Sequence, residues 1–253
     1  MNILAIDAAT DRFSVALGLE REARFETWLF EAAAGMRHCE LAASSVEMLA
    51  KRAGIEPGDI GGVVCAGGPG SFTGLRIGFS AAKGIALALG IPFAPIPTLD
   101  FMARPFGAWP GIALPAIDAK KKAFFCAPYR MGRRLGPDMD AQPWEIAAML
   151  AGLLGPGERA LVFGPGAALL CQELQRLSPD GLKEALALGS GLRWGNAEAL
   201  LEIARETGVF SQGRAAELSG NMLCGPEYLR QSDAEINLSR SGEGEGEAET
   251  LRP

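Results

Sequence analysis

The chain alternates between short apolar runs and longer segments in which apolar residues recur every three or four positions. Runs of four to eight residues are typical of strands, and a spacing of three to four is typical of helices. The runs predict strands at 2–6, 13–19, 23–30, 61–66, 123–129 and 159–163, and a last extended segment at 226–230. The spacing predicts helices at 40–53, 75–89, 144–154, 167–177 and 196–206. Alternating strands and helices indicate an α/β fold.

A four-residue string, Ala-Ile-Asp-Ala, occurs twice, at 5–8 and at 116–119. Each copy follows an apolar run and precedes a second strand-like segment. The repeat therefore predicts two lobes derived from one ancestral unit, with Asp7 and Asp118 at equivalent corners.

The Pro-rich stretch 91–115 cannot form one continuous helix, so we place the boundary between the lobes there. We expect a first lobe over 1–103 and a second lobe over 104–238, with its last segment returning to the first. In 239–253 glycine and glutamate alternate, which predicts a disordered acidic tail because such a composition cannot bury a core.

The most unusual segment is the loop 67–74, which places glycines between a buried-type strand and a helix. Its backbone N–H groups could hold an anion. Alternatively, the glycines supply a tight turn, and Ser71 or Thr73 caps the helix. The loop matches neither G-x-x-x-x-G-K-[ST] nor G-x-G-x-x-G.

The predicted helix 75–89 is apolar on almost every side, which exceeds what one sheet-facing stripe requires. Small residues recur in and just before it with a spacing of four, at Gly74, Gly78, Ala82 and Ala86. A smooth ridge of this kind permits close approach of another helix. Two interpretations stay open, namely burial inside this chain and docking of a partner helix.

Charge and cysteine usage limit the classes of partner and compartment. The chain has 24 Lys and Arg against 30 Asp and Glu, a net charge of −6, and half of that lies in the segment 241–253. A nearly neutral body disfavours unaided binding to nucleic acid. Five widely spaced cysteines without a C-x-x-C pair predict a reducing compartment, and no stretch of 18 apolar residues or cationic leader is evident. We expect a cytoplasmic protein.

The sequence offers residues for three kinds of catalytic site, and none of the three is complete. The only histidine, His38, cannot form a site that needs several imidazoles. A serine hydrolase would pair Ser71 with His38, but G-S-F-T-G is not a G-x-S-x-G elbow. Asp7 and Asp118 at strand ends resemble a carboxylate metal site of phosphoryl-transfer enzymes, yet neither is followed by a glycine-rich turn.

Several strings together carry a family resemblance. They are ILAIDAATDRFSVAL at 3–17, His-Cys-Glu at 38–40, GGPGSFTGLRIGFSAAKGIALALGIPFAPIPTLD at 67–100 and PEYLR at 226–230. The chain resembles the TsaB family, also called YeaZ, over nearly its whole length before the tail. It departs from the family where Asp118 is followed by three lysines instead of an Arg-rich turn.

The resemblance implies an α/β fold of the actin-like, sugar-kinase-like (ASKHA) class, built from two ribonuclease-H-like lobes. It implies a non-catalytic role in making threonylcarbamoyladenosine next to the tRNA anticodon, without cofactor or metal. The implied partners are TsaD, which transfers the threonylcarbamoyl group, and the ATPase TsaE, with self-association when the protein is alone. Contact with tRNA would occur only through the complex, and no membrane is involved.

The resemblance also assigns residues. The two partner-binding helices correspond to about 37–53 and 74–89 of this chain. The interface set is His38, Leu41, Ser45, Met48, Phe72, Thr73, Arg76, Ile77, Gly78, Ser80, Ala81, Ala82 and Ile85. Asp7, Thr10 and Asp118 would form a vestigial phosphate or metal corner. The rival functions are a glycoprotease-type peptidase and an actin-like nucleotide-hydrolysing protein, and the single histidine argues against the first.

Overall fold

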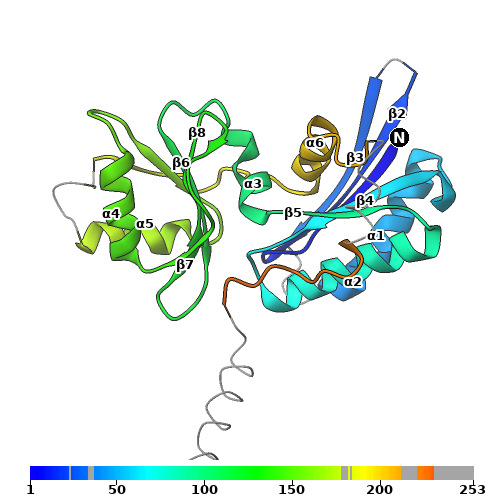
Figure 1. The fold of residues 1–253 in the computed structure, drawn as a ribbon, viewed down its shortest axis with the longest axis horizontal. Helices are drawn as coiled ribbons and strands as arrows, with labels where there is room; N and C mark the ends of the chain where they lie inside the picture. The colour runs from blue at the N-terminus through cyan, green and yellow to red at the C-terminus, as the bar shows by residue number, and fades with distance from the viewer. Residues whose placement is uncertain (23, 34–36, 178–181, 183, 212–220, 231–253) are drawn as a thin grey trace, which may run out of the picture.

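The protein consists of two lobes, each with a central β-sheet (Figure 1). The computed structural model describes residues 1–22, 24–33, 37–177, 182, 184–211 and 221–230. The predicted tail 239–253 lies outside the described residues.

The first lobe is built on a five-stranded sheet with the order β3-β2-β1-β4-β5. Its strands are β1 (Asn2–Asp7), β2 (Arg12–Arg21), β3 (Arg24–Ala33), β4 (Ile60–Ala66) and β5 (Phe93–Ile96). β1, β2 and β3 form an antiparallel meander, whereas β4 pairs in parallel with both β1 and β5. Helices α1 (His38–Ala53) and α2 (Phe72–Leu89) cover one face, and α6 (Ala197–Glu206) packs against β1, β2 and β4 on the other.

Burial on both faces explains why β1 and β4 read as continuous apolar runs. In β1, Leu4 and Ile6 join the core under α1 and α2, while Ile3 and Ala5 join the core toward α6. Successive side chains of a strand point to opposite faces, so a strand covered on both sides needs apolar residues at every position.

The second lobe repeats this plan with the strand order β10-β7-β6-β11-β12. Its strands in this order are β10 (Met139–Ala141), β7 (Phe124–Cys126), β6 (Ile112–Asp118), β11 (Ala160–Phe163) and β12 (Leu186–Leu188). Two short strands are added: β8 (Tyr129–Arg130) pairs with β6, and β9 (Arg133–Arg134) pairs with β8. β7 is antiparallel to β6, and β11 is parallel to it. Helices α4 (Pro143–Leu153) and α5 (Ala167–Leu177) contact each other, and residues of both lie in the core on one face of this sheet. The shared strand order confirms the predicted fold class of two ribonuclease-H-like lobes.

The lobes meet around α3 (Thr98–Ala103), which lies in the Pro-rich stretch. One buried cluster contains residues of β1 and β4, of α3 and α6, and of β6 and β11. This shared core joins the two lobes, while each lobe keeps a core of its own under its outer helices.

Several predicted bounds are wrong. β3 runs to Ala33, three residues past its predicted end, and α2 begins at Phe72, three residues early. The expected strand 123–129 is two strands, β7 and β8, separated at Pro128, which lacks the N–H needed for a continuous ladder. The segment 226–230 forms no strand.

By length and mean hydropathy, 18 residues at 1.2, α2 is also suited to cross a membrane. Core helices pass the same test. Leu75, Phe79, Ala82 and Ala86 of α2 are buried, and the helix contacts β4, β1, β5 and α1.

Candidate functional site

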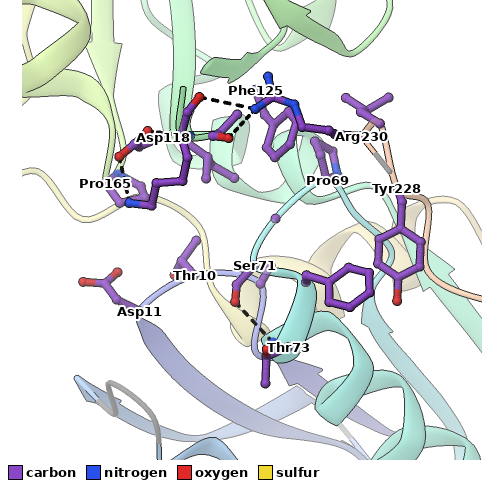
Figure 2. A pocket seen from close by; sticks show the side chains of 18 of the residues that line it. Thr10, Asp11, Pro69, Ser71, Thr73, Asp118, Phe125, Pro165, Tyr228 and Arg230 are labelled. Atoms are coloured by element: carbon purple, nitrogen blue, oxygen red, sulfur yellow. Dashed lines mark hydrogen bonds and ion pairs between the residues drawn. The ribbon is translucent and has the colours of Figure 1, made fainter. Parts of the chain in front are cut away.

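A cleft of about 830 Å³ opens between the lobes, where the turn after β1 faces the end of β6 (Figure 2). The wall formed by the first lobe includes Thr10, Asp11, Ser71, Thr73 and Ile77. The wall formed by the second lobe includes Ile117, Asp118, Lys120, Phe125 and Pro165. Residues 227–230 close one side.

The two repeated aspartates make the same local turn. Asp7 Oδ1 accepts a hydrogen bond from the N–H of Ala9 at 2.9 Å, and Asp118 Oδ1 accepts one from the N–H of Lys120 at 2.8 Å. Each aspartate ends the central strand of its sheet, next to an antiparallel neighbour. Both residues therefore occupy the equivalent strand-end corners that the repeat predicts.

The electrostatics of the two corners differ. Asp7 is 2% exposed, and burial raises its pKa to about 7, although the hydrogen bond from Ala9 opposes this rise. Burial also acts on Asp118, but the side chain and backbone N–H of Lys120 more than offset it and hold the pKa of Asp118 below its ordinary value. Thr10 and Asp118 line the cleft, whereas Asp7 does not. The corners therefore do not present a pair of carboxylates to one ligand.

The glycine-rich loop is a tight turn with a capped helix, as the second interpretation predicted. Ser71 Oγ accepts a hydrogen bond from the N–H of Gly74 at 3.2 Å, and Ser71 N donates to the Ala9 carbonyl at 2.7 Å. Gly68 has a φ of 113°, and its N–H donates to Thr98 Oγ1. These bonds occupy the N–H groups of Gly68, Ser71 and Gly74, so those three groups are not free to hold an anion.

A second repeat was missed by the sequence analysis. Gly-Pro-Gly stands at 68–70 before α2 and again at 164–166 before α5. The first glycine of each copy has a positive φ, 113° and 102°. At the last glycine of each copy, a Cβ would crowd the turn of the neighbouring corner, at Ala9 or at 116–118. The sequence alone shows this repeated string. In each lobe it stands where the last glycine packs against the turn that follows the aspartate.

The turn after Asp118 is basic and has an unusual backbone. Lys120, Lys121 and Lys122 all have positive φ values, 64°, 53° and 64°. All three residues are exposed, and Lys120 Nζ pairs with Asp118 at 2.9 Å.

Catalytic pairing of Ser71 with His38 is not found. The Ser71 hydroxyl caps α2, and no hydrogen bond between the two side chains exists among the described residues. His38 is 5% exposed, with its ring edge-on to Phe13 at 5.8 Å, and its buried Nε2 has no hydrogen-bond partner among the described residues. Within the described ranges, no three His, Cys, Asp or Glu side chains cluster so as to hold a metal ion.

The predicted interface residues fall into two groups. His38, Ser45, Gly78 and Ala82 are buried inside this chain. The other members are exposed or half-buried: Leu41, Met48, Phe72, Thr73, Arg76, Ile77, Ser80, Ala81 and Ile85. The structure thus corrects the placement of four of these residues, which cannot form an outer surface without unpacking the lobe.

The smooth ridge of α2 faces inward, so of the two interpretations left open the structure supports burial inside this chain. A Cβ at Gly74 would overlap the carbonyl of Ala8, and one at Gly78 would lie 3.4 Å from the Ala8 side chain. Ala82 and Ala86 are 0% and 2% exposed. The ridge lets α2 lie close to the corner that follows β1.

The outer side of α2 carries a second stripe of small residues, Ser80, Gly84 and Ala88, all exposed. A Cβ at Gly84 would meet no atom of the described part of the chain within 4 Å. Leu87, 71% exposed, flanks this stripe. We call Ser80, Gly84, Leu87 and Ala88 the outer helical face. Sequence analysis missed most of it, although its spacing of four equals that of the inner ridge.

Comparison with known proteins gives the family. Residues 32–163 match the family model described as TsaD, tRNA N6-adenosine threonylcarbamoyltransferase. The chain is 37% identical over 136 residues to a tRNA threonylcarbamoyladenosine biosynthesis protein TsaB of Escherichia coli, and 32% identical over 134 residues to the protein of that name in Bacillus subtilis. Each alignment covers 51% of this chain, and the chain spans about half of those relatives, 55% and 56%.

A longer match is to the uncharacterized protein Rv3421c of Mycobacterium tuberculosis, 32% identical over 186 residues, which covers 73% of this chain and 84% of the relative. A Pseudomonas aeruginosa structure described as similar to peptidase YEAZ superposes with a TM-score of 0.68 at 23% identity, over 90% of this chain and 99% of the other. A second structure, YeaZ from the same organism, gives 0.64 at 23% identity, over 84% and 93%. The matched model, the named relatives and the shared fold lead to one conclusion: the chain belongs to the TsaB (YeaZ) family.

Proposed function

We propose that this chain is a non-catalytic subunit in the biosynthesis of threonylcarbamoyladenosine in tRNA. It binds a TsaD-type threonylcarbamoyltransferase through the outer helical face and supports transfer to the adenosine next to the anticodon. The names of the relatives support the pathway, and the match to the TsaD model supports a partner of related fold. The proposal includes a cytoplasmic location, a TsaE-type ATPase that joins the complex, and self-association through the same face when TsaD is absent.

The single observation that carries the proposal is the outer stripe of α2. Ser80, Gly84 and Ala88 leave the helix backbone open to close approach, and Leu87 adds exposed apolar area beside them. The side of a surface helix that faces solvent usually carries charged and polar residues. Small residues spaced by four suit ridge-into-groove packing with another helix, and a standard interface buries about 800 Å² on each partner.

The non-catalytic part of the proposal rests on how candidate groups are used. Ser71 is occupied as a helix cap, His38 is buried beside Phe13, and Asp7 lies outside the cleft. A peptidase needs a nucleophile within hydrogen-bond reach of a base. No observation favours the peptidase or the nucleotide-hydrolysing alternative over the subunit role.

The test is to replace Gly84 by Leu. Because a side chain at this position extends into open space, we expect folding to be unaffected, with any change in stability favourable by up to about 1 kcal/mol from helix propensity. Binding of purified TsaD should weaken by roughly 30-fold or more, the equivalent of about 2 kcal/mol for a central interface position.

The matched control is Gly152→Leu on α4, where a helical glycine also has open space around its Cβ position. It should leave TsaD affinity unchanged. Complementation of a strain lacking this gene, with threonylcarbamoyladenosine in tRNA measured by mass spectrometry, should follow the binding result. Equal affinity of both variants for TsaD would refute the proposed surface.

A further inference from the structure

The segment 221–230 follows α2 along the first lobe and then reaches the second lobe beside β7 (Figure 1). It has no regular secondary structure after its first residues, yet the rest of the chain holds it at many points. Its contacts fall into a first-lobe group, a central aromatic group and a second-lobe group.

On the first lobe, side chains and backbone bind the start of the segment. Lys83 Nζ, from α2, donates hydrogen bonds to the carbonyls of Met222 and Cys224. Asn221 Nδ2 donates to the Phe93 carbonyl at 3.1 Å. The segment is thereby fixed along one flank of α2, while α1 packs on the same helix elsewhere.

In the centre, the segment touches the glycine-rich loop and the start of α2. Glu227 N donates to the Gly67 carbonyl at 2.8 Å, and a Cβ at Gly68 would overlap the Glu227 carbonyl. Tyr228 stacks on Phe72 at 4.8 Å between ring centroids, and its hydroxyl accepts from Arg76 Nε at 3.1 Å. Arg76 in turn lies 3.8 Å over the Phe72 ring.

On the second lobe, one residue makes the attachment. Arg230 forms a two-pronged ion pair with Asp140 of β10, with Nε to Oδ2 at 2.8 Å and Nη2 to Oδ1 at 2.6 Å. Its Nη1 donates to the Ala119 carbonyl at 2.8 Å and to the Lys120 carbonyl at 3.3 Å, just after the Asp118 corner (Figure 2). The side chains of Arg230 and Asp140 are 25% and 20% exposed, so the pair is partly shielded from water.

In the described part of the chain, two other crossings join the lobes, through α3 and through 189–196 before α6. Near α3, Asp100 accepts a hydrogen bond from Tyr129 Oη at 2.6 Å and pairs with Arg134. Residues 227–230 of the segment, by contrast, line the cleft itself. Crossings on one side leave a hinge, and a further link across the cleft restrains how far the hinge opens.

We propose that residues 221–230 are an interlobe tie, which sets the lobe angle through the Arg230–Asp140 pair and couples that angle to partner binding on α2 through Tyr228. The coupling to partner binding rests on the proposed function, because it requires a partner on the outer helical face. The control of the lobe angle by the Arg230–Asp140 pair concerns the isolated chain. Phe72 and Arg76 are the coupling residues, since they belong to α2 and contact Tyr228 directly.

The tie is tested by Arg230→Met, which keeps most of the aliphatic stem and removes the guanidinium. Spin labels at Glu47→Cys on α1 and Ala151→Cys on α4 report the distance between the lobes, with Cys39 and Cys224 changed to Ser; both label sites are exposed. We expect the distance distribution to become at least twice as wide. Arg176→Met, which breaks an exposed ion pair with Glu173 on α5, is the control and should leave the width unchanged.

Asp140→Asn attacks the same pair from the other side and guards against an unfolding effect of the first variant. It should widen the distribution as well, and the double variant should be no wider than Arg230→Met alone, because both changes break one link. An unchanged width in both single variants, with each chain folded by circular dichroism, would overturn the tie.

Coupling is tested by the affinity of purified TsaD for Arg230→Met. Coupling energies between sites typically change affinity about 5- to 150-fold, and we expect a loss of roughly tenfold here although the outer helical face is intact. If Arg230→Met widens the distribution of interlobe distances but binds TsaD with wild-type affinity, the coupling is refuted and the interlobe tie is supported. Wild-type affinity in Gly84→Leu would instead refute the proposed function, without touching the distance result.

Discussion

Helices α2 and α5 occupy the same place in the two lobes. Each follows a Gly-Pro-Gly turn after the strand that pairs in parallel with the central strand. Their outer faces differ in the middle of each helix: α5 exposes Gln172, Gln175 and Arg176 between Leu169 and Leu177, whereas α2 exposes the small residues Ser80, Gly84 and Ala88 after Arg76. The shared architecture accounts for the inner faces of both helices. The small-residue stripe of α2 has no such architectural cause, and it is the basis of the partner surface proposed above.

The largest expected effect separates the two sides of α2. Ala82→Glu places a carboxylate at a fully buried position of the inner ridge and should destabilise the chain by more than about 4 kcal/mol, or prevent folding. Urea denaturation measures this. Gly84→Glu, two residues further along and facing outward, should change the free energy of unfolding by less than about 1 kcal/mol. Similar losses in both variants would mean that the two sides of α2 are not distinct.

The second effect concerns the Asp7 corner. Since burial raises the pKa of Asp7 to about 7 from 3.8, the folded chain binds one more proton than the unfolded chain between these values, and stability falls as pH rises through this window. Asp7→Asn should therefore stabilise the protein at pH 8, by at most about 4 kcal/mol for a shift of this size. The gain should shrink toward pH 4.

Thermal or urea unfolding of wild type and Asp7→Asn at pH 8, 6 and 4 checks this expectation. The asparagine keeps an acceptor for the Ala9 N–H, so the hydrogen-bonded turn is retained. A difference between the two proteins that is the same at all three pH values would contradict a buried carboxyl with a raised pKa.

The smallest expected effect is at the Asp118 corner, where the pH dependence of stability has the opposite sign to that at Asp7. There the pKa is lowered, so the group stabilises the fold above its unfolded pKa, and this contribution disappears as pH falls through the folded value. Asp118→Asn should cost under about 1 kcal/mol at pH 7, since the Lys120 partner is exposed. Unfolding at pH 7 and pH 3 measures it. A stabilising effect at pH 7 would remove the contrast between the corners.

The sequence was sufficient for the plan of the molecule because that plan rests on repeated local chemistry. The Ala-Ile-Asp-Ala repeat located both corners, and α5 was predicted with its observed bounds. The strands β8, β9, β10 and β12 were not separately predicted, because two or three residues carry no readable period. Helix α3 was missed because prolines surround it, although none lies inside it.

The site was harder to predict because spacing does not identify what a helix packs against. Gly74, Gly78 and Ala82 share a face, as their spacing requires, but the neighbour that needs their small size is Ala8, which follows β1. Burial of Asp7 is likewise a tertiary property, since the same string leaves Asp118 partly exposed. Contacts of Tyr228 and Arg230 across more than 100 residues had no local signal.

The most direct test of the account is photocrosslinking from the outer face of α2. A benzophenone amino acid is placed at Ser80 in one protein and at Gln172, on the outer face of α5, in another. After irradiation with purified TsaD, we expect a covalent adduct from position 80 that mass spectrometry maps to one surface of TsaD, and none from position 172. Equal crosslinking from both positions, or an adduct from position 172 alone, would contradict the claim that α2 carries the partner surface.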